Sequence, residues 1–421
     1  MLLYGQGAPT KSFGCDEIKQ ALFDAFDRLG TRRKVLAIPP DFTRFHSRAG
    51  ELTAYAREYY GERLTDVLPA LGTHFRMTGA EIAKMFPGVP DSIFRVHNWR
   101  EDVVTVGVVP GEYVKEVSEG AVDYSVPMQV NRMLLEGGYD LILSLGQVVP
   151  HEVIGMANYN KNVFVGVGGS ECINKSHFIG AAYGMERIMG RASNPVRKVL
   201  NYASENFIGD MPLIYLQTVI SEGEDGLQMR GLYIGDDFEC FEKAAALSLE
   251  TNFRMTDREM KKVVVYLDPE EFRSTWLGNK SIYRTRMAIA DGGELVVLAP
   301  GLRQFGEDPV NDALIRKYGY VHTPQVLRYV GENGDLRDSL GVAAHLIHGT
   351  SEGRFRITYC PGHLTREEIE GVGFGYADLD EMMKRYDPKK LKDGWNTVDG
   401  EEIYFISNPA LGLWAYRDRF L

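Results

Sequence analysis

Short apolar runs alternate with amphipathic stretches along most of this chain. The runs Lys34–Pro39, Val67–Leu71, Tyr139–Leu145 and Val163–Val167 are continuously apolar, which is typical of strands buried on both faces of a parallel sheet. Polar or glycine-rich turns follow these runs, and then come stretches with helical spacing such as Glu51–Tyr60. The pattern predicts an α/β fold with a mostly parallel sheet.

The same pattern starts again after the polar stretch Met255–Lys262. It predicts one helix, Asn279–Ala290, and four strands: Val263–Leu267, Glu294–Ala299, Phe355–Tyr359 and Glu402–Ser407. A chain of 421 residues is long enough for two hydrophobic cores. We therefore expect two α/β domains, 1–260 and 261–399, that face each other across a cleft, with residues 400–421 returning to the first domain.

Composition narrows the classes of partner. The formal net charge is −11, which argues against binding nucleic acid or an anionic membrane surface. The four cysteines are far apart and form no CxxC pair, as expected in a reducing compartment. The first residues lack the pattern of a signal peptide, and no apolar run reaches the ~20 residues that span a bilayer. These features predict a cytoplasmic protein with no membrane segment.

Polar residues with chemical potential follow the predicted strands of the first domain. Asp41-Phe42-Thr43-Arg44 comes after Pro39-Pro40, His74 after a second strand and His151 after a third. The turn Gly166–Ser170 follows a fourth, and its bare amides suit a phosphate. Because the carboxyl ends of parallel strands share one edge, we expect these residues to meet in one crevice.

Each residue also has an ordinary interpretation when it is considered alone. A single histidine, such as His97, is more often a hydrogen-bonded structural residue than a catalytic one. Lys161 at a strand edge is usually solvated, and a glycine turn is often only a tight turn. Asp41 and Arg44 would make a normal loop-capping ion pair.

In combination, the order and spacing of these residues resemble the lactate racemase family, whose members carry a nickel-pincer nucleotide. The resemblance covers roughly residues 34–180 and has three parts. They are Asp-x-x-Arg at Asp41 to Arg44, Gly-x-His at Gly72 to His74, and a long block with His151, Lys161 ten positions on and His177 sixteen beyond that, with Gly166 and Glu171 in register.

The resemblance implies a cofactor and a set of roles. The cofactor is pyridinium-3,5-bisthiocarboxylic acid mononucleotide nickel, covalently attached at Lys161, with His177 as the protein ligand to nickel. His74 and His151 would be the two acid–base catalysts, and Arg44 would bind the substrate carboxylate. Further contacts to the cofactor are expected from Asp41, Thr43, Gly166 and Ser170.

This chemistry suits inversion at the alpha carbon of a 2-hydroxy acid. The alpha proton beside a carboxylate anion is very weakly acidic, so removal of that hydrogen as hydride avoids a carbanion. A base takes the hydroxyl proton at the same time, and the planar 2-keto acid can be reduced on its other face. The resemblance therefore predicts a racemase or epimerase whose partners are a small 2-hydroxy carboxylate and the cofactor-biosynthesis proteins that insert nickel.

Two departures from the family pattern bear on the substrate. A glycine-rich run usual between the first histidine and the lysine is replaced here by Gly155-Met156-Ala157-Asn158-Tyr159-Asn160. The second-domain lysine that contacts substrate has no clear counterpart, and Arg273 is the nearest basic residue. Arg303 and Gln304 are further candidates for substrate contact. A substrate larger or more polar than lactate, such as a sugar acid, is expected.

Two other functions fit some of the same residues. The first is a zinc-dependent hydrolase that uses His74, His151 and His177, although the chain has no HExxH helix. The second is a non-catalytic relative that binds a nucleotide or a carboxylate without turnover.

Overall fold

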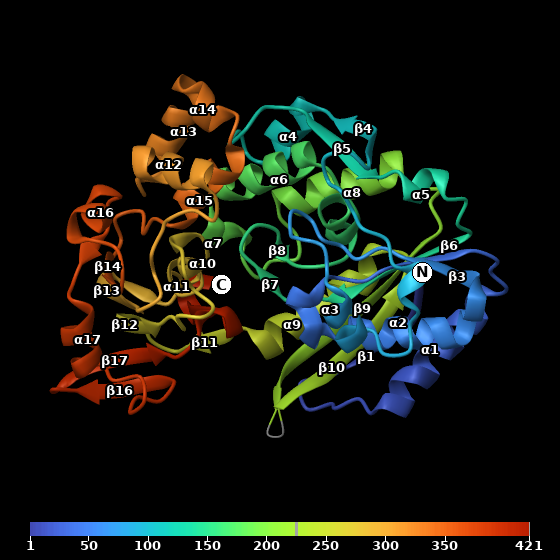
Figure 1. Ribbon diagram of the computed structural model, residues 1–421, viewed down its shortest axis with the longest axis horizontal. Coiled ribbons are helices and arrows are strands. Elements are labelled where there is room, and N and C mark those ends of the chain that lie inside the picture. Colours follow the sequence, from blue (N-terminus) through green and yellow to red (C-terminus); the bar gives the residue numbers. More distant parts are fainter. Residues whose placement is uncertain (224–225, 421) are drawn as a thin grey trace. The chain divides into compact units, whose positions relative to one another are not determined.

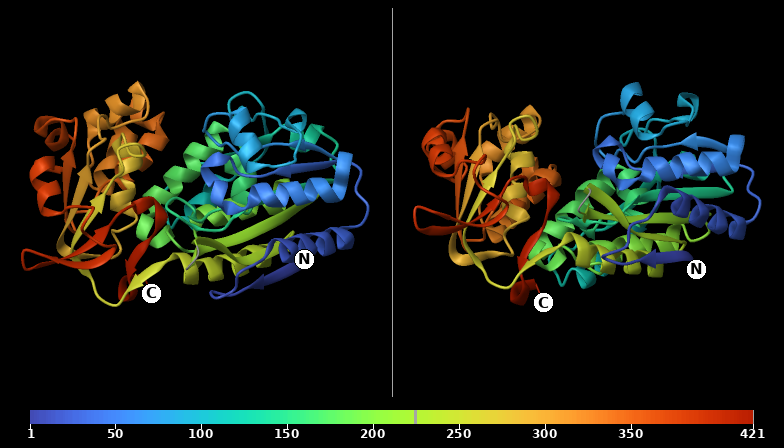
Figure 2. Two further views of the ribbon diagram at one scale, coloured as in Figure 1. Left: turned by 60° about the horizontal axis from the view of Figure 1, so that its bottom comes forward. Right: turned by 90° about the horizontal axis from the view of Figure 1, so that it is seen from below.

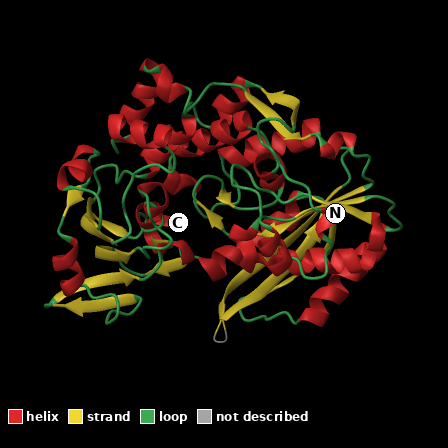
Figure 3. Ribbon diagram, in the orientation of Figure 1, coloured by secondary structure: helices red, strands yellow, loops and turns green. Residues whose placement is uncertain are grey.

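The computed structural model describes residues 1–223 and 226–420, which divide into two compact units. Unit 1 comprises Met1–Ile179 and Arg187–Asn252, and unit 2 comprises Gly180–Glu186 and Phe253–Leu421. Strands and helices alternate in both (Figures 1 and 3). The α/β class predicted from the hydrophobic pattern is confirmed. The cleft expected between the two domains stays a prediction.

The central sheet of unit 1 has six strands in the order β1-β10-β9-β6-β2-β3. The part β9-β6-β2-β3 is parallel, whereas β10 and β1 are added antiparallel at one edge. The strand bounds are β1 Leu2–Gly7, β2 Val35–Ile38, β3 Leu64–Val67, β6 Leu141–Gln147, β9 Leu213–Gly223 and β10 Gly226–Gly235. The four parallel strands give this sheet one common carboxyl edge, at which ligands usually bind.

Helices and small strand pairs surround this sheet. The helices are α1 Cys15–Leu29, α2 Ala49–Tyr60, α3 Gly79–Met85, α4 Gly111–Val117, α5 Met133–Glu136, α6 Ser170–Tyr183, α7 Met185–Ile188, α8 Pro195–Phe207 and α9 Phe238–Asn252. The small pairs are β4 Val103–Val109 with β5 Val126–Asn131, and β7 Pro150–His151 with β8 Gly155–Met156. The capping box at Thr78 and Glu81 that starts α3 is present as the sequence predicts.

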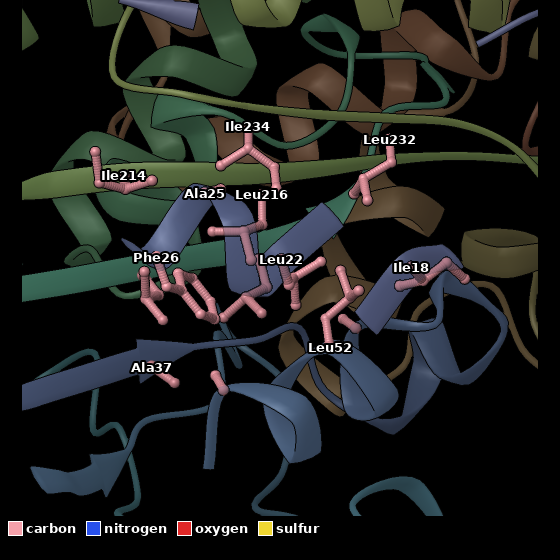
Figure 4. Close-up of a cluster of buried hydrophobic side chains, with 14 of the residues drawn as sticks. Ile18, Leu22, Ala25, Phe26, Ala37, Leu52, Ile214, Leu216, Leu232 and Ile234 are labelled. Carbon is pink, nitrogen blue, oxygen red and sulfur yellow. The ribbon is translucent and has the colours of Figure 1, made fainter. Parts of the chain in front are cut away.

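A single apolar core joins α1 and α2 to one face of the sheet. On α1 the buried residues Ile18, Leu22, Ala25 and Phe26 recur at helical spacing and form one stripe. Figure 4 shows this stripe against Leu52 of α2 and against strand residues of the sheet: Ala37, Ile214, Leu216, Leu232 and Ile234. Burial of this stripe removes enough apolar surface from water to hold both helices on the sheet.

The opposite face of β9 is directed toward the segment that carries the candidate site. Tyr215, which alternates with Ile214 and Leu216 along the strand, packs against Tyr159 with ring centroids 4.3 Å apart. The next outward residue, Gln217, contacts the sulfur of Cys240 on α9. One strand thus contributes both to the apolar core and to the support of Tyr159.

The predicted strand Val163–Val167 is wrong. Residues Asn162–Gly166 form a single π-helical turn, in which the Val167 N–H donates to the Asn162 carbonyl. Both neighbours of β6 in the sheet are already supplied by β2 and β9. A short apolar run cannot by itself distinguish a buried strand from a buried helical turn, which explains the error.

Unit 2 contains a second six-stranded sheet in the order β15-β14-β13-β12-β17-β16. It is parallel except for β16. The strand bounds are β12 Met260–Tyr266, β13 Ile289–Ala299, β14 Arg356–Pro361, β15 Gly375–Tyr376, β16 Gly394–Val398 and β17 Glu401–Ile406. A short parallel pair joins β11 Arg254–Thr256 to β18 Trp414–Tyr416.

Helices lie on both sides of this second sheet (Figure 2). On one face, Met382 of α17 (Leu379–Arg385) packs against Val264, Val296 and Phe405. On the other face, Tyr359 donates a hydrogen bond to Asn279. The helices are α10 Thr275–Gly278, α11 Lys280–Tyr283, α12 Pro309–Tyr318, α13 Thr323–Glu332, α14 Gly334–Arg337, α15 Leu340–His348, α16 Arg366–Gly371, α17 Leu379–Arg385 and α18 Arg417–Phe420.

Two predictions for the second half of the chain are wrong. Residues 400–421 do not return to the first domain, because β17 pairs with β12 of the second sheet and β18 pairs with β11. The predicted helix Asn279–Ala290 is reduced to the short α11, and Ala290 already belongs to β13. Among the residues described, no helix is both long and apolar enough to cross a bilayer.

Candidate active site

The carboxyl edge of the parallel strands in unit 1 carries the predicted site residues. Asp41 and Arg44 follow β2, His74 follows β3, and His151 follows β6. Pairing of β2 with β3 and with β6 is parallel, so these three loops emerge at the same edge. The structure has the parallel strand arrangement from which the sequence pattern predicted that these loops converge.

Asp41 and His74 form a hydrogen-bonded pair. The Asp41 Oδ2 and His74 Nδ1 atoms lie 2.7 Å apart, and Asp41 also accepts from the Thr43 amide at 3.2 Å. Burial by itself raises the pKa of the Asp41 carboxyl, but the hydrogen bonds from His74 and Thr43 outweigh it, and the net pKa lies below its ordinary value. An ionised carboxylate only accepts, so it holds the proton of neutral His74 on Nδ1 and leaves a lone pair on Nε2.

His151 has the opposite ring orientation. Its Nδ1 accepts a hydrogen bond from the Val153 amide at 3.1 Å, so the proton of the neutral ring is on Nε2. The short pair β7–β8 holds this loop, with His151 opposite Gly155. The side chain is only 11% exposed.

Lys161 directly precedes the π-helical turn and is held there by the residue that follows it. The side-chain amide of Asn162 lies within hydrogen-bond distance of the Ile38 carbonyl at 3.0 Å, and of Ser144 and Leu145 on β6 at 3.2 Å each. Asn162 thereby connects the ends of β2 and β6 to the turn. No sequence pattern indicates this role, because Asn162 has the position of a polar flank of an apolar run.

The electrostatic behaviour of Lys161 shows which groups surround it. Burial lowers the pKa of its amine to about 8, and the nearby Arg44 guanidinium lowers it further, while Glu152 and Asp41 act in the opposite direction. At pH 7 about a tenth of such an amine is unprotonated, far more than for an ordinary lysine. A lysine with this property can act as a nucleophile.

His151 and His177 respond to the same charges. Burial lowers the pKa of His151 well below its ordinary value; Lys161, Arg44 and His177 add to the effect, and Glu152 opposes it. Burial also lowers the pKa of His177 to about 4, with a further contribution from Lys161. The structure therefore brings Arg44, His151, Lys161 and His177 together from four separate segments.

His177 has the geometry of a metal ligand. Its Nδ1–H donates to the Ile173 carbonyl one turn earlier on α6, at 2.6 Å. This bond fixes the tautomer and leaves the Nε2 lone pair available, as is usual for histidines that bind metals. The low pKa keeps the ring neutral at physiological pH.

Glu152 is a site residue that sequence reasoning missed. Its carboxylate lies 3.9 Å from Nδ1 of His151 and influences the pKa values of His151, Lys161 and His177. Its place next to His151 was the only available signal. A negative charge here offsets part of the positive charge of Lys161 and Arg44.

The glycine turn before α6 is explained mainly by packing. A Cβ on Gly168 would lie 1.8 Å from the Phe164 carbonyl oxygen, and a Cβ on Gly169 would lie 2.2 Å from the Gln129 side chain. The Gly166 carbonyl accepts from the Gly72 amide at 2.8 Å, which connects the turn to the loop of His74.

Thr43 donates its hydroxyl to Asp41, and Ser170 begins α6. Cofactor contacts by Thr43, Gly166 and Ser170 stay predictions.

His97 has the structural role that is usual for a lone histidine. It is buried, its Nε2–H donates to the Gly168 carbonyl at 2.9 Å, and its Nδ1 accepts from Asn131 at 3.0 Å. These contacts support the glycine turn.

The predicted substrate contacts of the second domain lie next to one another in unit 2. The Arg303 amide donates to the Arg273 carbonyl at 3.0 Å, and Gln304 forms a β-bridge with Ser274. Both arginines are exposed, and they follow β12 and β13 at the carboxyl edge of the second sheet. This is the edge at which parallel sheets bind ligands, so their assignment as substrate contacts is kept as a proposal.

His345 in unit 2 is a buried structural histidine. Its Nε2 lies 2.8 Å from the Tyr320 hydroxyl, and its ring stacks on Trp276 with centroids 4.4 Å apart. Burial lowers its pKa to about 3, with a smaller contribution from His348. The unfolded chain protonates this histidine near pH 6.5, whereas the folded chain does so only near pH 3. The residue therefore leaves the free energy of unfolding at its full value above pH 6.5 and lowers it as the pH falls from 6.5 toward 3.

We expect the substitution His345→Gln to reduce this acid sensitivity. Between pH 7 and pH 4.5 the wild type should lose about 3 kcal/mol of unfolding free energy through this residue, and the variant should not. Urea unfolding at the two pH values measures the difference. His322, whose side chain is 61% exposed, offers a matched control for the replacement of histidine by glutamine itself. Equal acid losses in wild type and His345→Gln would contradict the prediction.

Comparisons with known proteins show one matching family and similar solved structures. Residues 17–187 match the family described as the lactate racemase N-terminal domain. This segment contains Asp41, His74, His151, Lys161 and His177. The resemblance inferred from the sequence is confirmed over this N-terminal segment.

Two solved structures are similar over nearly the whole chain. A protein from Thermotoga maritima, solved in a structural genomics programme, superposes with a TM-score of 0.79 at 26% identity, covering 98% of this chain and 100% of that one. The lactate racemase apoprotein from Thermoanaerobacterium thermosaccharolyticum superposes with a TM-score of 0.70 at 16% identity, covering 96% of this chain and 93% of that one. The second likeness shows a shared fold. The sequence matches none of the curated proteins with which it was compared.

Proposed function

We propose that this chain inverts the alpha carbon of a 2-hydroxy acid with a nickel-pincer nucleotide bound in unit 1. The observation that carries the proposal is the convergence of Lys161, His151, His177 and Arg44 from separate segments. Arg44 and Lys161 both lower the pKa of His151, and Lys161 also lowers the pKa of His177. The family of the N-terminal domain supports it.

The residues of the site fit this cofactor. A largely buried lysine with a pKa of about 8 can form a covalent bond through Nζ. A neutral imidazole with a free Nε2 suits nickel, for which nitrogen is a good donor. When bound, the nickel-pincer nucleotide supplies the acceptor for the hydride that leaves the alpha carbon.

The two catalytic histidines are prepared in complementary states. Neutral His74 has its lone pair on Nε2, because Asp41 holds Nδ1–H, and it can accept the hydroxyl proton of one enantiomer. His151 presents Nε2–H, because the Val153 amide occupies Nδ1, and it can donate to the oxygen of the planar keto acid. Inversion requires a proton acceptor on one face of the planar keto acid and a proton donor on the other, and the two histidines would supply them.

Loss of the charge on Lys161 would also affect His151. Once Nζ is part of a neutral amide-type bond, one of the cations that depress the pKa of His151 is gone. The ring can then take up a proton more readily, and Glu152 at 3.9 Å stabilises the imidazolium. Both histidines would then have a carboxylate near Nδ1.

Arg44 is assigned to the substrate carboxylate. Its guanidinium is close enough to lower the pKa values of Lys161 and His151, so it is a cation within the site. A planar fork of N–H donors binds a carboxylate through two hydrogen bonds and fixes the direction of the alpha carbon.

The substrate class is proposed to be larger and more polar than lactate. Glu152 places a carboxylate beside His151, and such a group accepts hydrogen bonds from additional hydroxyls. Arg273, Arg303 and Gln304 of unit 2 are proposed as further contacts. Sugar acids carry the hydroxyls that these residues would recognise.

The competing hydrolase function lacks support. In the part of the chain that the structure describes, no three His, Cys, Asp or Glu side chains are gathered so as to hold a metal ion by themselves. A catalytic zinc site normally needs three protein ligands. A cofactor that brings its own donor atoms needs fewer, as proposed here for His177.

A substrate screen tests the proposed function. Protein produced together with the cofactor-biosynthesis proteins is incubated with enantiopure 2-hydroxy acids and aldonates, and the products are separated on a chiral phase. We expect interconversion at C2 of at least one polyhydroxy acid, and none with protein produced without the cofactor pathway. Loaded protein that converts no 2-hydroxy acid would favour the non-catalytic alternative.

A further inference from the structure

The segment before Lys161 has an unusual backbone. Asn158 and Tyr159 both adopt left-handed conformations, with φ values of 66° and 59°. For a bulky residue such as tyrosine this conformation is an outlier that the surroundings must hold in place. At these positions the sequence has Asn158-Tyr159 in place of a glycine-rich run, so the chain adopts the left-handed conformation without glycine, the residue that adopts it freely.

Arg197 holds this segment from α8. It is fully buried, and its Nη2 donates to the Met156 carbonyl at 2.7 Å. Its Nη1 donates to the Asn160 side-chain oxygen at 2.5 Å and to the Asn158 carbonyl at 3.3 Å. One guanidinium therefore spans the segment on both sides of the left-handed residues.

Two more residues of α8 extend the contact. The Asn160 amide donates to Asn201 at 2.8 Å and to the Ser204 hydroxyl at 3.1 Å. Arg197, Asn201 and Ser204 are spaced i, i+4 and i+7, so they lie on one face of the helix. We call these three residues the α8 polar stripe.

The charge of Arg197 argues against a role limited to filling space in the core. Burial lowers its pKa to about 9, so it is still a cation at neutral pH. Its acceptors are neutral, and its guanidinium lies over the Phe241 ring at 4.2 Å. Burial of an arginine without a carboxylate is costly, and an apolar side chain of similar size would fill the same space at less cost.

We propose that Arg197, through the α8 polar stripe, is a positioning residue that holds Asn158–Asn160 in the conformation that presents Lys161 to the cofactor. The proposal rests on the proposed function in one respect, namely that Lys161 is the attachment point. It assigns to Arg197, 36 positions after Lys161 in the sequence, the task of holding a left-handed backbone that glycine would adopt freely.

The test compares Arg197→Met with a matched buried arginine. Arg230 on β10 is also buried, and its acceptors are also neutral. They are the Ser221 hydroxyl and the backbone carbonyls of Lys11 and Glu222. Both variants and the wild type are produced with the cofactor pathway. Two quantities are measured: the fraction of protein with an added mass on the Lys161 peptide, and amide hydrogen exchange over residues 153–166 in protein without cofactor.

We expect Arg197→Met to lower the modified fraction at least tenfold and to speed exchange in residues 156–161 at least tenfold, and Arg230→Met to change neither. Asn158→Gly adopts the left-handed conformation freely, so in the Arg197→Met background it should restore at least half of the modified fraction. A role limited to core packing would not be rescued in this way. If Arg197→Met is insoluble, Arg197→Lys decides, because an ammonium keeps the charge but cannot span three acceptors.

The proposal would be overturned if Arg197→Met or Arg197→Lys kept both its amide exchange rates and its modified fraction within twofold of the wild-type values. So would a folded double variant in which Asn158→Gly restores nothing. A wild type with no added mass on Lys161 would refute the attachment itself, and the exchange data would then judge the role of Arg197 separately.

Discussion

Replacing Lys161 with alanine is expected to abolish both the covalent cofactor and racemisation. Protein made with the cofactor pathway should exceed its sequence mass by one pyridinium nucleotide, and Lys161→Ala should show the sequence mass alone. The physical reason is that Nζ of this largely buried lysine, with its pKa lowered to about 8, is the nucleophile in the site that is unprotonated to a useful extent near pH 7. Intact-mass measurement and chiral separation of products give the two readouts.

Lys175 provides a control for this experiment. It lies on α6 in the same domain and pairs with Glu171 and the Ser125 carbonyl. Lys175→Ala should keep the full mass increment and most of the activity. A Lys161→Ala protein that still carries the increment would show that the cofactor is attached elsewhere or not covalently.

Removing either catalytic histidine should greatly slow interconversion while the cofactor stays attached. For His74→Ala and for His151→Ala we expect a loss of about 10²- to 10⁴-fold in kcat, the usual range for a general acid or base. The adduct should persist, because neither ring bonds to Lys161. Initial rates of interconversion from each enantiomer, together with intact mass, measure both effects.

His46 is the matched control for the histidine variants. It is exposed on the same loop as Arg44 and stacks edge-on against Phe45. His46→Ala should retain near-normal rates. Near-normal racemisation in either His74→Ala or His151→Ala would show that the assignment of two acid–base residues is incorrect.

The sequence allowed much of the site to be predicted because its pattern is local. Strand ends are visible as apolar runs that stop at polar residues, and this placed Asp41, His74 and His151 at one edge of a parallel sheet. The spacing from His151 to Lys161 and His177 identified the family without any structure. The fold class followed from the same alternation of strand and helix patterns.

Other features depend on contacts between residues far apart in the chain. The bond between Asp41 and His74 joins loops 33 positions apart, and the ring orientation of His151 depends on one backbone amide. Arg197 reaches a segment nearly forty positions earlier, where it holds two left-handed residues that no local pattern reveals. Glu152 became part of the site only through its distance from His151.

By itself the sequence determined the alternation of elements, the edge of the sheet at which the candidate site residues lie and the residue types that gather there. These depend on short-range periodicity and on the shared direction of parallel strands. Only the tertiary structure decided that Asn162–Gly166 forms a π-helical turn, that residues 400–421 pair with β12 and β11 in unit 2, and which tautomers His74, His151 and His177 adopt. Those outcomes depend on which hydrogen-bond partners and strand neighbours are near in space, and a linear pattern of polarity contains no information on them.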